Sequence, residues 1–165
     1  MSESTRKSRR QVVDSLHQVA AEMHNRMQRG DPPRMTLPVR SKSNISFDNR
    51  LGVFKYGKSK TVRDATKLGS ARQLLRTLHI TEFIEEMIDS GKSSTLREMY
   101  YISEGWGNGK FGSQNESNNL AEDLEIVTKC LREDFKLRPE EDGARIIGNI
   151  TVEERNRRGE WMTIN

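Results

Sequence analysis

Residues 70–91, SARQLLRTLHITEFIEEMIDSG, carry the clearest helical pattern in the chain. Their apolar side chains recur three and four residues apart, which places them on one face of an α-helix. Ser70 and Gln73 have the spacing of a capping box at the helix start, and Gly91 is typical of a helix end. The segment therefore predicts a long helix that contributes to the core with Leu74, Leu75, Leu78, Phe83, Ile84, Met87 and Ile88.

The segments around this helix predict an α+β, mostly helical fold. Helical spacing predicts further helices over residues 8–30, 95–104 and 119–135. Alternation predicts a hairpin over 44–56, and strands over 144–152 and 161–164 joined by a basic turn. Helix, short helix, helix and hairpin is the element order of a CAP-like winged helix. We expect an N-terminal tail and amphipathic helix (1–37), a β-hairpin segment (38–64) and a winged-helix domain (65–165).

Composition excludes several classes of protein. The chain has 165 residues, 33% of them hydrophobic and 32% charged, which predicts a modest core. One cysteine, Cys130, cannot form an internal disulfide, and three scattered histidines give no metal-ligand spacing. No stretch is long and apolar enough for a membrane span, and the first residues lack the apolar segment of a signal peptide. We expect a soluble, intracellular protein with no metal site of its own.

The net charge of +4 is unevenly distributed. Residues 1–64 contain 14 basic and 6 acidic residues, a net of +8, whereas residues 65–165 contain 14 basic and 18 acidic residues, a net of −4. The basic part suggests contact with a polyanion or an acidic partner; a solvated tail is the alternative. The amphipathic helix over residues 8–30 also has two interpretations, because its apolar stripe can dock on a partner or pack on its own domain.

The short helix over residues 95–104 presents two tyrosines on different faces. At 100° per residue, Leu96, Met99 and Tyr100 point inward, while Tyr101 points outward next to Arg97, one turn earlier. A phenol attacking a phosphodiester needs a cation to stabilise the developing charge, which an arginine supplies. Such a pair is therefore a candidate nucleophile with its electrostatic helper, although a simple stacking contact has the same spacing.

Four stretches resemble one known family: TLREMYYISEGWG (residues 95–107), FGSQNES (111–117), LREDFKLRPEEDGARIIGNITVEERNRRGE (131–160) and PVRSKSNISFDNRLGVFKYG (38–57). The chain resembles the A subunit of archaeal DNA topoisomerase VI, a type IIB topoisomerase, and more distantly its meiotic double-strand-break relatives. The resemblance covers the chain from about Pro38. It implies that Tyr101, the second aromatic of the Arg-Glu-x-Tyr-Tyr motif, is the nucleophile that forms a transient 5′-phosphotyrosyl bond. It also implies that Arg97 assists at the phosphate.

The same resemblance implies what else the reaction requires. In the family, a Toprim domain downstream holds Mg²⁺, and this sequence ends before it, so we expect an N-terminal fragment that is inactive alone. ATP is held by a partner, the B subunit of topoisomerase VI, and two A subunits form a homodimer within a heterotetramer. Double-stranded DNA is the substrate, no membrane is involved, and the location is the archaeal cytoplasm, at the nucleoid.

Candidate DNA contacts surround the tyrosine and the predicted wing. They are Lys110, Gln114 and Asn115 near Tyr101, and Arg145, Arg155, Arg157 and Arg158 in or beside the basic turn. Glu122, Asp123 and Glu125 are expected near the start of the 119–135 helix, where they would repel phosphate and prevent deep base reading. Two other functions stay open: a winged-helix regulator that binds DNA without cutting it, and a meiotic-type protein that breaks DNA without strand passage.

Overall fold

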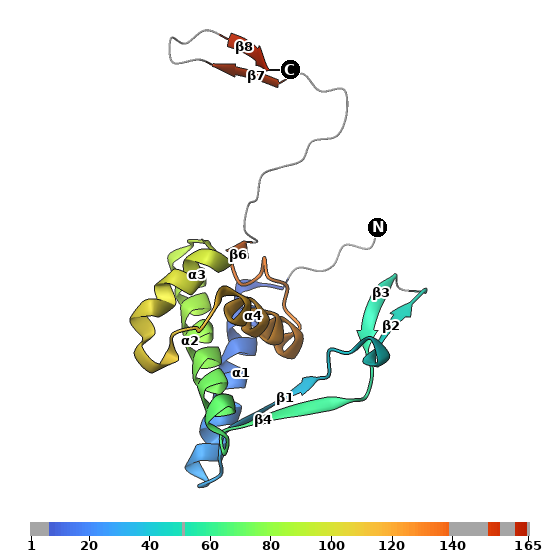
Figure 1. Ribbon diagram of the computed structural model, residues 1–165, viewed down its shortest axis with the longest axis vertical. Coiled ribbons are helices and arrows are strands. Elements are labelled where there is room, and N and C mark those ends of the chain that lie inside the picture. Colours follow the sequence, from blue (N-terminus) through green and yellow to red (C-terminus); the bar gives the residue numbers. More distant parts are fainter. Residues whose placement is uncertain (1–6, 51, 139–151, 156–160, 165) are drawn as a thin grey trace.

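The computed structural model describes residues 7–50, 52–138, 152–155 and 161–164. The elements follow the chain in an α+β order in which helices predominate (Figure 1). In sequence they are α1 (Arg9–Gln28), β1 (Arg34–Pro38), η1 (Lys42–Asn44), β2 (Ile45–Asp48), β3 (Val53–Tyr56), β4 (Lys60–Asp64), α2 (Leu68–Ser90), β5 (Ser94–Thr95), α3 (Leu96–Ile102), η2 (Ser103–Gly109), α4 (Gln114–Thr128), β6 (Leu137–Arg138), β7 (Val152–Arg155) and β8 (Trp161–Ile164).

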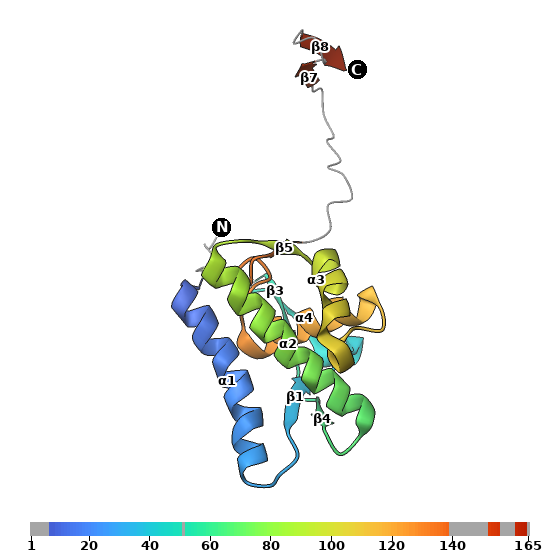
Figure 2. The ribbon, with the colours of Figure 1, turned by 90° about the vertical axis from the view of Figure 1, so that its left-hand side faces the viewer.

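Helix α2 runs through the middle of the helical body, with α1 along one side of it (Figure 2). Most of its predicted core residues are buried, but Leu75 is 38% exposed, so its place in the predicted core is wrong. Gly91 ends the helix in the left-handed conformation (φ 69°). The predicted start is wrong, because the helix begins at Leu68 and the Ser70 side chain does not cap it. The Ala71 amide already donates to the Lys67 carbonyl at 2.8 Å, so the first turn forms ahead of the predicted capping box.

Helix α1 begins close to the predicted start, with a capping box in which Ser8 and Gln11 bond each other's backbone amides. Its apolar stripe is buried against the rest of the body through Val12, Leu16, Val19 and Met23. Of the two alternatives for this stripe, packing on its own domain is therefore the one the structure contains.

The bounds predicted for the fourth helix are wrong at both ends. Helix α4 begins at Gln114, where the Ser113 hydroxyl accepts from the Glu116 amide, and it ends at Lys129, which is left-handed (φ 54°). Phe135, the last residue of the predicted helix, is fully buried but lies in the turns that follow α4. The apolar spacing thus continues past the point where the helix stops.

Residues 34–64 form an extension that we call the arm, made of β1, η1, β2, β3 and β4 (Figure 1). Strands β2 and β3 pair antiparallel as predicted, with Phe47 opposite Phe54. The sequence did not predict β1 and β4, which pair antiparallel from Arg34 opposite Asp64 to Pro38 opposite Lys60. This second ladder links the hairpin to the helical body.

Two further strand pairs complete the described fold. Ser94–Thr95 pairs in parallel with Leu137–Arg138, a contact that was not predicted. Strand β8 lies where predicted and pairs antiparallel with β7, so Arg155 ends a strand instead of lying in the basic turn. Most of the strand predicted over 144–152 lies outside the described residues, and the winged-helix domain division stays a prediction. Among the described helices, none has the length and apolar character needed to cross a membrane.

Candidate functional site

Helix α3 holds the candidate nucleophile. The Thr95 hydroxyl accepts from the Glu98 amide at 3.0 Å, and the Glu98 carboxylate accepts from the Thr95 amide at 2.8 Å, which fixes the start of this seven-residue helix. Leu96 and Met99 are buried, so the opposite face points to solvent. Tyr101 is 57% exposed, whereas Tyr100 packs against the core, as the helical wheel predicted.

Arg97 is also exposed and precedes Tyr101 by one helical turn. Side chains at this spacing are neighbours on a helix surface. The ring of Tyr100 lies beside that of Tyr101, with 5.5 Å between their centroids, and restricts the rotation of the Tyr101 side chain on that side. The structure therefore brings the predicted pair to one exposed face; their chemical roles are not tested by this geometry.

Arg138 is a further cation at this helix that the sequence analysis missed. The parallel pairing of β5 with β6 places it opposite Thr95, at the start of α3. The pKa of Glu98 lies below its ordinary value because the Thr95 backbone amide and the Ser94 hydroxyl donate to its carboxylate, and the positive charge of Arg138 adds to this effect. Glu98 is therefore an ionised cap at neutral pH and a poor proton acceptor for the phenol.

The glycine-rich segment after α3 forms the 3-10 element η2, which packs against α2. The Trp106 ring stacks on His79 with 5.1 Å between centroids and meets Phe111 edge-on at 5.4 Å. Gly109 is required here, because a Cβ at this position would lie 2.4 Å from the His79 ring. The Ser103 hydroxyl, fully buried, donates to the Tyr100 carbonyl at 2.6 Å, so the end of α3 is held by the same packing.

The predicted DNA contacts beyond α3 lie on the next segment. Lys110 is exposed and pairs with Glu104 at 3.3 Å, so its charge is partly compensated. Gln114 is the first residue of α4 and Asn115 follows it on the exposed side. In the adjoining turn, Arg76 of α2 donates to the Lys110 carbonyl at 2.8 Å and also pairs with Glu116. The segment is thus anchored to α2, the helix that also supports α3.

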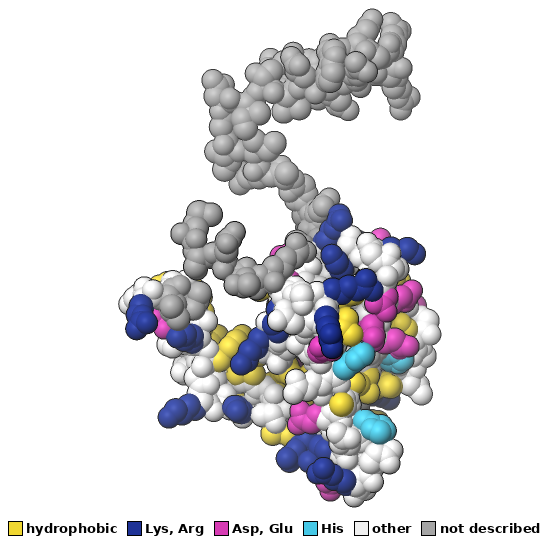
Figure 3. Space-filling model, turned by 180° about the vertical axis from the view of Figure 1, so that it is seen from behind, with side chains coloured by type: hydrophobic (Ala, Val, Ile, Leu, Met, Phe, Trp, Pro, Cys, Tyr) yellow, Lys and Arg dark blue, Asp and Glu magenta, His cyan; other side chains and the backbone are white. Residues whose placement is uncertain are grey.

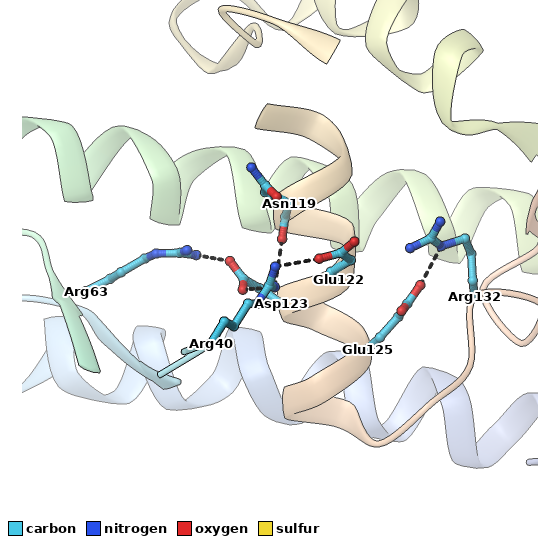
Figure 4. A network of polar contacts seen from close by, with 7 residues as sticks. All are labelled: Arg40, Arg63, Asn119, Glu122, Asp123, Glu125 and Arg132. Carbon is cyan, nitrogen blue, oxygen red and sulfur yellow. Dashed lines mark hydrogen bonds and ion pairs between the residues drawn. The ribbon is translucent and has the colours of Figure 1, made fainter. Parts of the chain in front are cut away.

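Glu122, Asp123 and Glu125 lie in the second half of α4 and not near its start, and each pairs with an arginine (Figure 4). Arg40 contacts Glu122 at 2.5 Å and also pairs with Asp123, while Arg132 contacts Glu125 at 2.6 Å. Their predicted position near the helix start is therefore wrong, and their expected effect on base reading stays a prediction. They hold other parts of the chain onto α4.

We call Arg40, Arg63 and Asp123 the arm clamp. Asp123 is 2% exposed and receives Arg40 from the segment after β1 and Arg63 from β4 (Figure 4). Arg40 also donates to the Asn119 carbonyl at 3.2 Å. The Arg63 contact is an ion pair without hydrogen-bond geometry. No local pattern predicted this clamp, because Arg40 and Asp123 are 83 residues apart in the sequence.

The remaining predicted residues are only partly covered by the structure. Arg155 ends β7, and Arg145, Arg157 and Arg158 lie outside the described residues. Within the described ranges, no three His, Cys, Asp or Glu side chains gather into a group that could hold a metal ion. These residues therefore do not fit a magnesium site, and no chemical step is assigned to a metal on them.

Comparison with known proteins gives consistent matches over the whole chain. Residues 72–137 match a family model described as "Type IIB DNA topoisomerase", and residues 140–165 match one described as "All-beta domain in DNA topoisomerase VI alpha subunit". The first match runs from α2 to β6 and includes Arg97 and Tyr101. The second contains the residues predicted as the wing, so a domain boundary between 138 and 140 is an alternative to the single 65–165 domain.

Proteins named as the A subunit of type 2 DNA topoisomerase 6 are similar over nearly the full chain. The protein of Halobacterium salinarum is 43% identical over 97% of this chain and 44% of its own length. That of Natronomonas pharaonis is 44% identical over 89% and 40%, and that of Archaeoglobus fulgidus 43% identical over 91% and 42%. The chain thus spans less than half the length of these relatives. It belongs to the family of type IIB DNA topoisomerase A subunits.

Proposed function

We propose that this chain is the DNA-binding and DNA-cleaving part of a topoisomerase VI-type A subunit, with Tyr101 as its nucleophile. The observation that carries the proposal is the exposure of Tyr101 beside Arg97 on α3, at the motif position that the resemblance assigns to the nucleophile. Tyr100, its neighbour in the motif, packs against the core and is a poor candidate for the same role.

The proposed step exchanges one phosphodiester bond for another. The Tyr101 phenol oxygen attacks phosphorus, the bond from phosphorus to the 3′ oxygen breaks, and a 5′-phosphotyrosyl bond forms. The phenolic proton leaves and the 3′ oxygen takes up a proton, so no net proton or electron is consumed. Arg97 stabilises the added negative charge at phosphorus. Because the ester bond is conserved, attack by the 3′ hydroxyl reverses the step and reseals the strand.

The remaining parts of the reaction are proposals that extend beyond this chain. Two copies of the A subunit would cut the two strands, and strand passage would relax or decatenate DNA. A Toprim domain of the full-length protein would hold Mg²⁺, and the B subunit would bind ATP within a heterotetramer. We expect the 165-residue chain alone to bind duplex DNA weakly and to leave it uncut. Cleavage by this chain with Mg²⁺ alone would contradict that division of labour.

Two single substitutions test the nucleophile. The full-length A subunit is assembled with the B subunit, Mg²⁺, ATP and supercoiled DNA, and detergent is added to trap protein covalently attached to DNA. We expect Tyr101→Phe to abolish the covalent complex and supercoil relaxation. Tyr100→Phe is the matched control, because it removes the neighbouring hydroxyl and keeps the ring, and we expect it to retain the complex.

Each outcome of this experiment is informative. A covalent complex that persists with Tyr101→Phe contradicts the proposal. Double-strand breaks that depend on Tyr101 without relaxation would identify a meiotic-type cleavage protein. DNA binding by the assembled wild-type protein without any covalent complex would instead favour a regulator.

A further inference from the structure

The β2–β3 hairpin presents an uncovered aromatic face. The register pairs Ile45 with Tyr56 and Phe47 with Phe54, so these four side chains share one face of the two-stranded sheet. We call them the hairpin face. Phe47 is 50% exposed, Phe54 74% and Tyr56 43%, and the two phenylalanine rings lie 5.0 Å apart. An apolar face of this kind normally packs on a core, and an exposed patch usually marks an interaction site.

The hairpin is rigidly attached at its base. The buried side chain of Asn44 donates to the Val39 and Ser59 carbonyls at 2.8 and 2.9 Å and accepts from the Ser59 amide at 3.0 Å. Gly57 passes so close that a Cβ there would lie 2.5 Å from the Asn44 side-chain oxygen. Together with the arm clamp, these contacts hold the hairpin face in a fixed orientation relative to α4. A partner therefore meets a preformed surface.

Positive charge surrounds the hairpin face. Residues 42–60 contain five basic residues and one acidic residue. The acidic one, Asp48, is paired with Lys55 at 2.5 Å. No ion pair with a described residue compensates the other four, which are Lys42, Arg50, Lys58 and Lys60. On the side of the molecule where the arm lies, Lys and Arg side chains flank hydrophobic ones (Figure 3).

We propose that the hairpin face and its lysines bind duplex DNA at a second position, away from Tyr101. Lysine and arginine would contact phosphates, and the exposed phenylalanines would pack against sugar and base edges of the minor groove. Figure 1 places the hairpin and α3 on opposite sides of the helical body. The choice of DNA as the ligand rests on the proposed function, and the hairpin face adds a DNA contact outside the cleavage site.

The positive charge around the hairpin face favours DNA over a second copy of this chain as the molecule that binds there. Two hairpins meeting face to face would each bring the same excess of positive charge, which opposes association. A polyanion with apolar surface between its charges satisfies both the cations and the aromatic pair. An acidic protein partner satisfies the cations as well, and DNA binding that does not depend on the hairpin would favour such a partner over DNA.

The test measures binding of the 165-residue chain to a labelled duplex by fluorescence anisotropy over a range of salt concentrations. We expect the double variant Phe47→Ala/Phe54→Ala to bind about tenfold more weakly, because two edge contacts together should contribute about as much as the weaker cases of one aromatic ring stacked on a base. Its control is Met27→Ala, which removes an apolar side chain of similar exposure from α1. We expect Lys58→Ala/Lys60→Ala to lower the slope of log affinity against log salt by about 2, near 0.9 for each lost phosphate contact.

Charge on α1 provides the second control. Arg10→Ala/Arg29→Ala removes two exposed cations outside the arm and should leave the slope close to that of the wild type. The proposal would be overturned if Lys58→Ala/Lys60→Ala and Arg10→Ala/Arg29→Ala gave the same slope of log affinity against log salt. It would also be overturned if removal of both phenylalanines left the affinity for DNA unchanged. Sedimentation velocity on the same samples detects self-association, and a dimer that only the phenylalanine variant loses would identify the hairpin face as a protein contact instead.

The DNA contact of the hairpin and the role of Tyr101 are tested by different measurements, so either can fail without the other. The hairpin variants change equilibrium binding, whereas Tyr101→Phe changes formation of a covalent bond. A covalent complex that persists in Tyr101→Phe, together with intact hairpin-dependent binding, removes only the proposed nucleophile and leaves the hairpin contact standing. Loss of hairpin dependence with an intact Tyr101-dependent complex removes only the inference.

Discussion

Replacing Asp123 by Asn should loosen the arm from α4. In the wild type this nearly buried carboxylate pairs with Arg40 and Arg63, which come from two separate segments of the arm. The substitution keeps the shape of the side chain and removes its charge. Arg63 then has no described acidic partner, and Arg40 retains Glu122 at 2.5 Å.

The size of the effect follows from how deeply the three groups are buried. Removing one partner of a buried ion pair typically costs about 3–5 kcal/mol, because the other charge stays desolvated. The arginine side chains are still 29% and 21% exposed, which allows water to compensate part of the loss. We therefore expect a loss of about 3 kcal/mol in the free energy of unfolding. For a chain of this length that corresponds to a fall in Tm of about 6–12 °C.

Urea and thermal unfolding, followed by circular dichroism, measure this change. Glu122→Gln is the matched control, since it also removes a carboxylate contact of Arg40 from α4 but at a half-exposed position. Exposed ion pairs contribute about 0.2–1 kcal/mol, so the control should stay within that range. Hydrogen exchange gives a local measure, in which amides of β1 and β4 should lose protection in Asp123→Asn more than in the control.

Two results would contradict the role assigned to Asp123. If Asp123→Asn and Glu122→Gln lowered stability equally, burial of the Asp123 carboxylate would not be what makes the clamp strong. If stability fell while the arm amides kept their protection, Asp123 would stabilise α4 and not its attachment to the arm.

Two further predictions concern the start of α3 and the base of the hairpin. Because the pKa of Glu98 is lowered in the folded protein, its charge adds stability above its ordinary pKa of 4.5 that is lost as the pH falls through the lowered value. Wild type should therefore be more stable than Glu98→Gln at neutral pH, with the difference disappearing in acid unfolding curves. Asn44→Ala leaves the Val39 carbonyl and the Ser59 amide without this partner and should cost about 1–3 kcal/mol in urea unfolding, whereas the exposed Asn49→Ala should cost little.

The outward position of Tyr101 could be predicted because its causes are local. A capping box between Thr95 and Glu98 sets the start of α3, and the helical period then fixes which side chains point inward. The same reasoning failed at Ser70, where the pattern is present but backbone bonds start the helix earlier, at Leu68. It failed again at α4, where the cap at Ser113 precedes a polar first turn that has no apolar spacing to signal a helix.

The arm clamp and Arg138 could not be predicted because they depend on contacts between distant segments. The β1–β4 ladder joins strands that carry Pro38 and several charges, which do not read as paired strands. Arg138 reaches α3 only because β6 pairs with β5. A single sequence contains no local signal for either pairing, so the predicted site lacked one of its cations and its link to the arm.

These distant contacts change how the uneven charge of the chain acts on DNA. By sequence, the half that carries Tyr101 is acidic and the N-terminal 64 residues are basic by +8. In the structure, Arg40 and Arg63 pair with Glu122 and Asp123 of α4, and Arg132 pairs with Glu125, so a phosphate near that helix meets carboxylates that are already paired. At physiological salt, charges interact over about 8 Å, and compensation at this range is what counts. Within the described residues, Lys42, Arg50, Lys58 and Lys60 around the hairpin have no such ion pair, and the salt dependence of DNA binding should therefore follow the hairpin more than α4.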